Sequence, residues 1–205
     1  MVKLDRWSRD MTTANKITIS RVILIPIMII VLYIDALKIP TDFLAMNVQQ
    51  IIFAALFVVA SFTDFLDGYI ARKYNQITTF GKFLDPIADK VLVVAALLYL
   101  MIQMPNRVAL WTVMIVIVRE FMVTGVRLLA VEKQIVIAAS KWGKYKTFST
   151  MIAIIIFLFN DFGLVTINPG FEWLGNSIYY LAIFFTIFSG FDYLWKNRSI
   201  VLESM

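Results

Sequence analysis

The sequence predicts an all-α, polytopic integral membrane protein with six transmembrane helices and both termini in the cytoplasm. Of its 205 residues, 60% are hydrophobic and only 16% are charged, whereas soluble domains carry about 25% charged residues. The mean hydropathy is +0.81, and a water-soluble fold would have no interior large enough for so much apolar surface. Six separate apolar stretches are long enough to cross a bilayer.

The six predicted spans are separated by short segments that carry turn formers or charges. Proline-containing turn signals occur at 39–42, 104–106 and 168–170, after the first, third and fifth spans. The fifth span is the shortest. The six spans are 17–37, 51–72, 83–104, 107–130, 147–163 and 175–195.

The distribution of basic residues along the chain predicts the orientation. Of the 19 Lys and Arg residues, 16 lie in the N-terminal segment up to Arg21, the second-to-third and fourth-to-fifth connections, and the tail. Lys38 and Arg107 lie on the opposite side, and Arg119 falls inside a span. Because basic loops stay in the cytoplasm, we expect a protein of the cytoplasmic membrane with its active site at the cytoplasmic face. The net charge of +5 then reflects topology and anionic membrane lipid, and no nucleic-acid partner is needed to explain it.

Residues 1–16 allow two interpretations. Leu4, Trp7 and Met11 would share one face of a short helix in the membrane interface. Alternatively, Met11 is the natural start and the ten residues before it are an extension. The segment does not resemble a cleaved signal, because the first apolar run is too long. We therefore divide the chain into this N-terminal segment, a membrane domain 17–198 and a tail 199–205.

The chain contains no cysteine and no histidine. The missing cysteine excludes disulfides, thiol nucleophiles and thiolate metal sites. The missing histidine excludes the commonest general base and the usual zinc ligand. Acid–base chemistry must therefore use Asp, Glu, Lys or Tyr, and any bound metal is expected to be a hard cation held by oxygen.

Four aspartates, at 64, 67, 85 and 89, lie where the second span ends and the third begins. The apolar run of the second span, 51–62, covers about 18 Å as a helix, which is less than the ~30 Å of a hydrocarbon core. That helix must therefore continue through Asp64 and Asp67, and the same shortfall draws Asp85 and Asp89 into the third helix. Each pair has helical spacing, i to i+3 or i to i+4, and so lies on one helix face.

Two such helices would direct four carboxylates into one cavity, where their charges repel unless they are countered. Two divalent cations, Mg²⁺ or Mn²⁺, would balance the charge, and carboxylates are ligands that both ions prefer. A two-metal site suits displacement at phosphorus. The alternative is ion pairing with the basic residues nearest in sequence. These are Arg72, Lys73, Lys82 and Lys90.

This segment resembles the signature of the CDP-alcohol phosphotransferases. Residues 64–72 read DFLDGYIAR and residues 81–89 read GKFLDPIAD, which matches all eight fixed positions of D-x-x-D-G-x-x-A-R-x8-G-x-x-x-D-x-x-x-D. The resemblance implies transfer of the phosphoryl-alcohol part of a CDP-linked donor to a second alcohol, with release of CMP, by a homodimer. The unrelated phospholipase D-type lipid synthases need a catalytic histidine and are excluded.

The resemblance also implies roles for individual residues. Asp64, Asp67, Asp85 and Asp89 would bind the two cations, and Asp89 would also take the proton of the acceptor hydroxyl. Since no residue resembles a covalent nucleophile, we expect direct in-line displacement. The CDP-binding residues implied by the resemblance are Asp64, Asp67, Gly68, Ala71, Arg72, Gly81, Asn15 and Thr18.

Basic residues elsewhere in the chain bear on the acceptor. Arg119 lies about 16 Å inside the fourth span, where an arginine requires an anionic partner, either a ligand phosphate or a carboxylate. We expect Glu120 to point elsewhere on the helix; it shares a face with Arg127 and could pair with it. The lysines that open the fifth span are either membrane-surface anchors or anion ligands. The predicted ring around a doubly negative acceptor consists of Arg21, Arg119, Arg127, Lys141 and Lys144.

Three further motifs resemble the phosphatidylglycerolphosphate synthase branch of the family. They are N-x-x-T-x-x-R at 15–21, R-E-x6-R at 119–127 and G-K-x-K-T at 143–147. The resemblance implies CDP-diacylglycerol as donor and sn-glycerol 3-phosphate as acceptor. Alternatives within the family make cardiolipin or use inositol phosphate or serine as acceptor. A divalent-cation transporter is the alternative from another class, because carboxylates in membrane helices also mark ion paths.

Overall fold

The computed structural model describes the backbone of residues 13–73, 79–135, 137 and 140–202. It describes the side chains of the same residues except 13–17, 64–73 and 79–86. Within these ranges the regular structure is helical, as the sequence predicted, and a single isolated antiparallel bridge joins Pro40 to Asn47. The chain divides into two compact units, residues 1–95 and 96–205.

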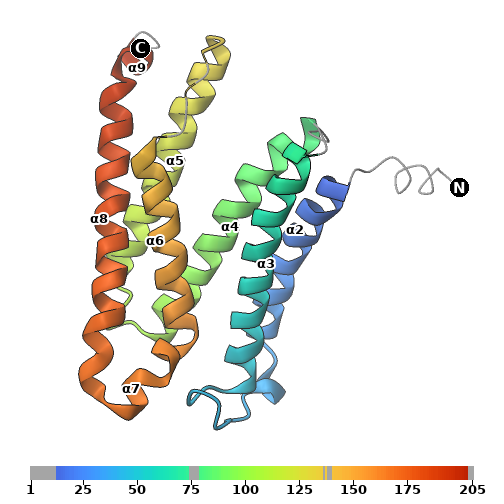
Figure 1. Cartoon of the computed structure of the whole chain (residues 1–205), viewed down its shortest axis with the longest axis vertical. Helices are drawn as coiled ribbons and strands as arrows, with labels where there is room; N and C mark the ends of the chain where they lie inside the picture. Colours follow the sequence, from blue (N-terminus) through green and yellow to red (C-terminus); the bar gives the residue numbers. More distant parts are fainter. Residues whose placement is uncertain (1–12, 74–78, 136, 138–139, 203–205) are drawn as a thin grey trace, which may run out of the picture. The chain divides into compact units, whose positions relative to one another are not determined.

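The first unit contains α2 (Thr13–Val31), η1 (Asp35–Leu37), α3 (Val48–Lys73) and the first part of α4 (Thr79–Gln103). Helices α2 and α3 lie side by side (Figure 1) and pack through fully buried apolar side chains such as Met28 and Phe53. Gln49 on α3 donates from Nε2 to the carbonyl oxygens of Val31 and Leu32, at 3.0 and 3.1 Å. These bonds satisfy carbonyls that the end of α2 leaves without helical partners.

The second unit contains the rest of α4 and the helices that follow it. Helices α6 and α5 both pack against α8, and the core between them includes Ile154, Phe157 and Tyr179, each at most 2% exposed. The hydroxyls of Thr112 on α5 and Tyr179 on α8 are hydrogen-bonded at 2.6 Å. These helices are α5 (Leu110–Glu132), α6 (Lys141–Leu158), η2 (Asn160–Gly163), α7 (Leu164–Ile167), η3 (Pro169–Phe171), α8 (Glu172–Lys196) and α9 (Arg198–Leu202).

A long helix lies at the position of each of the six predicted spans, namely α2, α3, α4, α5, α6 and α8. By length and hydropathy, Pro169–Lys196 is the one helix in the described part of the chain that could cross a membrane unaided. Lys141–Leu158 and Asn160–Ile167 make a second candidate if this bent pair counts as one span. Six spans and cytoplasmic termini therefore stay predictions.

Two of the predicted spans differ from the helices found. The first helix ends at Val31, and a 3-10 turn at Asp35–Leu37 follows where the prediction had continuous helix to 37. The fifth span is not straight, because the chain bends by 58° after Leu158. Asn160, Asp161 and Phe162 all have positive φ, and this left-handed backbone cannot continue an α-helix.

Candidate active site

The backbone confirms that the helices continue through the aspartates. Helix α3 runs without interruption through Asp64 and Asp67 to Lys73, and α4 carries both Asp85 and Asp89 after its start at Thr79. The side chains of most residues in this motif lie outside the described part of the chain. The predicted site residues whose side chains lie outside it are Asn15 of the N-terminal motif and, in the aspartate motif, Asp64, Asp67, Gly68, Ala71, Arg72, Gly81 and Asp85.

Asp89 is the aspartate of the motif whose side chain the structure describes. Its Oδ1 accepts a hydrogen bond from Nη1 of Arg21 on α2 at 2.7 Å. Arg21 is fully buried, whereas the Asp89 side chain is 45% exposed. A charge-assisted bond of this kind fixes the direction of the carboxylate. The structure therefore supplies an orienting partner for Asp89 on a different helix.

The sequence analysis placed Arg21 near the acceptor phosphate and sought counterions for the aspartates closer along the chain. A signal for the observed pairing was present in helix α2. Thr18, Arg21, Ile25 and Met28 are all buried, and their spacing puts Arg21 on the inward face of the helix. An arginine on an inward face requires an anion nearby.

The metal prediction rests on residues that are only partly described. Among the described side chains, no group of three or more acidic, histidine or cysteine residues is placed to hold an ion. Three of the four predicted ligands lie outside that set. Asp89 fits the expectation, because it presents a partly exposed carboxylate and carboxylate oxygen suits a hard divalent cation.

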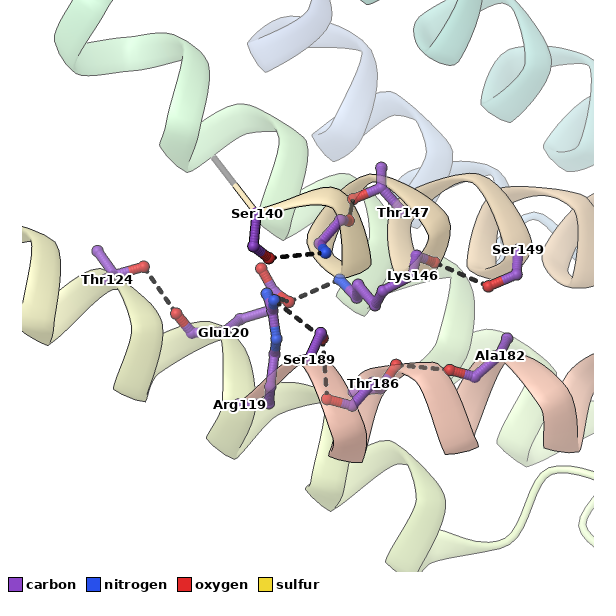
Figure 2. Close-up of polar contacts among 11 residues, drawn as sticks. Arg119, Glu120, Thr124, Ser140, Lys146, Thr147, Ser149, Ala182, Thr186 and Ser189 are labelled. Carbon is purple, nitrogen blue, oxygen red and sulfur yellow. Dashed lines mark hydrogen bonds and ion pairs between the residues drawn. The ribbon is translucent and has the colours of Figure 1, made fainter. Parts of the chain in front are cut away.

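Three charged side chains of the second unit form a buried cluster (Figure 2), which we call the Glu120 cluster: Arg119, Glu120 and Lys146. Oε1 of Glu120 accepts from Nη1 of Arg119 at 2.9 Å and from Nζ of Lys146 at 2.6 Å. The three side chains are 13%, 14% and 7% exposed. The cluster joins α5 to α6, and two cations share one carboxylate.

The expectation that Glu120 would point away from Arg119 is wrong. Neighbouring residues leave a helix in different directions, but both of these side chains are long enough to turn toward α6. There Lys146 pairs with the Glu120 carboxylate. Arg127 instead places its guanidinium carbon 5.8 Å from the centre of the Tyr193 ring. The anionic partner that Arg119 requires is thus present within the chain.

Helix α8 and the start of α6 complete the surroundings of Arg119. Its Nη2 donates to Oγ of buried Ser189 at 3.1 Å. A Cβ added at Gly190 would lie 3.0 Å from Cγ of Arg119, so glycine there lets α8 approach the arginine closely. A Cβ added at Gly143 would lie 3.8 Å from Nη2 of Arg119. The guanidinium therefore lies close to the first turn of α6, where the N–H of Gly143 donates to the hydroxyl of Ser140 at 3.0 Å.

The acceptor ring predicted from sequence is brought together in part. Lys141 and Lys144 are exposed residues in the opening turns of α6, next to the turn that Arg119 faces. Arg127 is exposed further along α5, and Arg21 belongs to the first unit.

Lys146 was missed as a site residue because it was grouped with the surface lysines around it. Helix periodicity could have identified it, because Lys146 is in phase with the buried residues Thr150, Ala153 and Phe157 of α6. A lysine that continues an inward-facing stripe requires a buried anionic partner.

A second buried ion pair lies beyond the other end of α6 and was also missed. Arg107 binds the Asp161 carboxylate through two nitrogens, with Nη2 to Oδ1 at 2.9 Å, and its Nε donates to Oδ1 of Asn176 at 2.7 Å. Its guanidinium carbon lies 4.3 Å from the centre of the Phe157 ring. We call these residues, with Gly175 beside them, the Arg107 cluster.

Comparison with known proteins gives a consistent result. The family profile described as CDP-alcohol phosphatidyltransferase matches residues 11–188. A relative from Bacillus subtilis is 41% identical over 89% of this chain and 93% of its own, and one from Rickettsia prowazekii is 36% identical over 90% and 94%. A relative from Haemophilus influenzae is 34% identical over 92% and 95%. All three are named CDP-diacylglycerol–glycerol-3-phosphate 3-phosphatidyltransferase. This chain therefore belongs to the CDP-alcohol phosphatidyltransferase family.

Proposed function

We propose that the protein transfers the phosphatidyl group of CDP-diacylglycerol to sn-glycerol 3-phosphate and releases CMP. The observation that carries this proposal is the 41% identity, over 89% of the chain, to a relative whose name states this donor and this acceptor. The complete eight-position aspartate signature at 64–89 supports the same chemistry. The absence of histidine and cysteine from the chain limits the acid–base groups to Asp, Glu, Lys and Tyr, and the signature provides four aspartates.

The second unit supplies the features that a phosphorylated acceptor needs. Arg119 and Lys146 are buried cations that share the carboxylate of Glu120. The first turn of α6 lies beside Arg119 and carries Lys141 and Lys144. Buried cations at a helix N-terminus favour a phosphate over an uncharged alcohol. We assign Arg119, Lys141 and Lys144 to the acceptor phosphate, with Arg127 as a further cation of the same unit.

The first unit supplies the groups for the donor and for proton removal. Asp64, Asp67, Asp85 and Asp89 would hold two divalent cations, which polarise phosphoryl oxygens when they are bound. Asp89 acts as the base for the acceptor hydroxyl, and Arg21 holds its carboxylate in a fixed direction. Gly68, Ala71, Arg72, Gly81, Asn15 and Thr18 are assigned to the CDP group of the donor.

The lipid tails of the donor set the location of the enzyme. Six helices at the positions of the apolar runs would form six membrane spans, with both termini and the aspartates at the cytoplasmic face of the cell membrane. The diacyl tails then stay in lipid while the head group reaches α3 and α4. The protein is proposed to act as a homodimer.

The test is CMP release by purified protein with CDP-diacylglycerol, Mg²⁺ or Mn²⁺, and one acceptor at a time. Glycerol 3-phosphate, inositol phosphate, serine and phosphatidylglycerol are compared, with a chelated sample and Asp89→Asn as inactive controls. We expect release with glycerol 3-phosphate alone, and none after chelation. Release with a different acceptor contradicts the assignment of the acceptor, and release by folded Asp89→Asn at the wild-type rate removes Asp89 as the base.

A further inference from the structure

We propose that the C-terminal end of α8, where Arg198 lies against the exposed ring of Trp195, binds the head group of an anionic phospholipid in the surrounding membrane. This lipid is a neighbour of the enzyme and is neither the donor nor the acceptor, so the inference goes beyond the proposed function. It rests on α8 crossing the membrane, as the length and hydropathy of Pro169–Lys196 allow.

One face of α8 is a continuous stripe of exposed apolar side chains. On the opposite, buried face, Tyr179 contacts Thr112 of α5 and Phe157 of α6. The exposed side chains recur at steps of three, four or seven residues, which keeps them on one side of the helix. An exposed apolar stripe of this length is unfavourable in water and fits the hydrocarbon of a bilayer. Its members, each at least 44% exposed, are Trp173, Tyr180, Phe184, Ile187, Phe191 and Trp195.

A tryptophan lies at each end of the stripe. Trp173 and Trp195 are 63% and 60% exposed, and their separation of 22 positions corresponds to about 33 Å of helix. This length matches the ~30 Å hydrocarbon core of a bilayer, and tryptophan is enriched at both membrane–water interfaces. When α8 crosses the membrane, the two rings therefore lie at the head-group level of opposite leaflets.

At the C-terminal end of the stripe, a cation lies over the aromatic ring. The guanidinium carbon of Arg198 is 4.6 Å from the centre of the Trp195 ring, and the Phe191 ring stacks on Trp195 with 6.0 Å between centres. Arg198 is exposed, and no carboxylate among the described side chains pairs with it. The contact with the ring holds the cation at the level of the tryptophan. There a guanidinium can donate two hydrogen bonds to the phosphate of a lipid head group.

The break between α8 and α9 holds Arg198 in this place (Figure 1). Asn197 ends α8, and its Nδ2 donates to the carbonyl oxygen of Tyr193 at 2.7 Å. In α9, Ile200 is 7% exposed, and its carbonyl oxygen accepts from Nζ of Lys133 at 3.4 Å. Helix α9 is thus packed against α5, and its first residue, Arg198, stays beside the end of α8.

The opposite end of the stripe differs in charge. Residues 160–175 contain no Lys or Arg, and Glu172 directly precedes Trp173. Arg107 donates to the carbonyl oxygen of Glu172 at 3.5 Å, but its guanidinium is bound to the Asp161 carboxylate. A head group with net negative charge is attracted to exposed cations at the membrane surface. We therefore expect a preference for anionic lipid beside Trp195 and none beside Trp173.

The test measures which lipid lies beside each tryptophan when the whole protein is placed in phosphatidylcholine nanodiscs. Lipids with brominated acyl chains quench the fluorescence of tryptophans that they contact. The emission of Trp195 is the difference between wild type and Trp195→Phe, and that of Trp173 is the difference between wild type and Trp173→Phe. Brominated phosphatidylglycerol and brominated phosphatidylcholine are compared at the same low mole fraction.

We expect phosphatidylglycerol to lie beside Trp195 about fivefold more often than phosphatidylcholine, which is the effect of one cation near the membrane surface. Arg198→Gln should remove this preference, and Arg198→Lys, which keeps the charge, should retain at least about a twofold preference. If Arg198→Gln is not recovered folded, Arg198→Ala makes the same comparison. Trp173 is the matched control and should be quenched equally by the two lipids in every variant. High salt should weaken the preference at Trp195, because Arg198 is exposed.

Four results would overturn the inference. Two are equal quenching of Trp195 by both lipids and an unchanged preference in a folded variant without the arginine. The third is no quenching by either lipid, because protein, such as a second copy of the chain, then covers the stripe. The fourth is loss of the preference when inorganic phosphate is added at constant ionic strength, which would assign Arg198 to a soluble anion. None of these measurements depends on turnover, so a failure of the proposed function is detected separately, by CMP release.

Discussion

The Arg107 cluster and the Glu120 cluster lie near opposite ends of α6 in the same unit, and they differ in how their charged groups are joined. In the Arg107 cluster, one guanidinium faces one carboxylate and an amide oxygen, so the charges cancel. In the Glu120 cluster, two cations face one carboxylate. The first cluster joins one cation to one carboxylate, whereas in the second the carboxylate of Glu120 joins cations from two helices.

The backbone conformation around the two clusters differs as well. Asp161 lies in a turn of left-handed residues and is 3% exposed, and the Arg107 bonds tie that turn to the beginning of α5 and to α8. The Glu120 cluster lies between regular helices, and Nη2 of Arg119 lies close to Gly143 in the first turn of α6. Backbone geometry therefore distinguishes an ion pair at a left-handed turn from a cluster between regular helices, to which we assign a role in binding the acceptor.

The largest expected effect is on stability, from Asp161→Asn. Asparagine tolerates the left-handed backbone at this position, so the change mainly leaves the buried Arg107 charge without its carboxylate. Removing one partner of a buried ion pair destabilises by about 3–5 kcal/mol. Unfolding by urea in a mild detergent should show this loss of stability. The KM for the acceptor should stay unchanged in the folded fraction.

A double variant, Arg107→Met with Asp161→Asn, sharpens the measurement. It removes the unpaired cation together with the carboxylate, so we expect it to be more stable than Asp161→Asn alone. A double variant that is no more stable would show that the Arg107 bonds to other groups, and not the unpaired charge, account for the loss.

These clusters mark the boundary of what the sequence could predict. Apolar runs and helix arithmetic predicted the long helices and the continuation of α3 through Asp64 and Asp67, because these follow from local periodicity. The pairing of Arg119 with Glu120 was predicted wrongly, because it depends on where α6 packs. The bend after Leu158 could have been anticipated from Asn160, Asp161 and Gly163, which are residues that tolerate left-handed backbone.

Two alanine substitutions in α8 should separate the clusters by their readouts. A Cβ at Gly175 would clash with Oδ1 of Asp161 and lie 2.7 Å from Nη2 of Arg107. The displaced ion pair should reduce the free energy of unfolding by about 1–3 kcal/mol, as for other overpacked sites, without changing the acceptor KM.

The matched variant, Gly190→Ala, adds a Cβ 3.0 Å from Cγ of Arg119. The side chain can yield by a few tenths of an ångström, and the higher helix propensity of alanine offsets about 1 kcal/mol of the strain. We therefore expect little change in stability and an increase in the acceptor KM of about three- to tenfold, because the guanidinium is displaced. Equal stability losses in the two variants would contradict the distinction between the clusters.

The smallest effect is expected from Ser189→Ala, which removes the hydroxyl that accepts from Nη2 of Arg119. A hydrogen bond of this kind contributes about 1 kcal/mol, which corresponds to an increase in the acceptor KM of about fivefold. Ser149→Ala is the control, because its hydroxyl donates at 3.1 Å to the carbonyl of Lys146 in its own helix and not to a charged group. If the two variants have the same acceptor KM, Glu120 alone orients Arg119 and α8 contributes only packing. If Ser189→Ala has the larger KM, the position of the arginine is set jointly by Glu120 on α5 and Ser189 on α8.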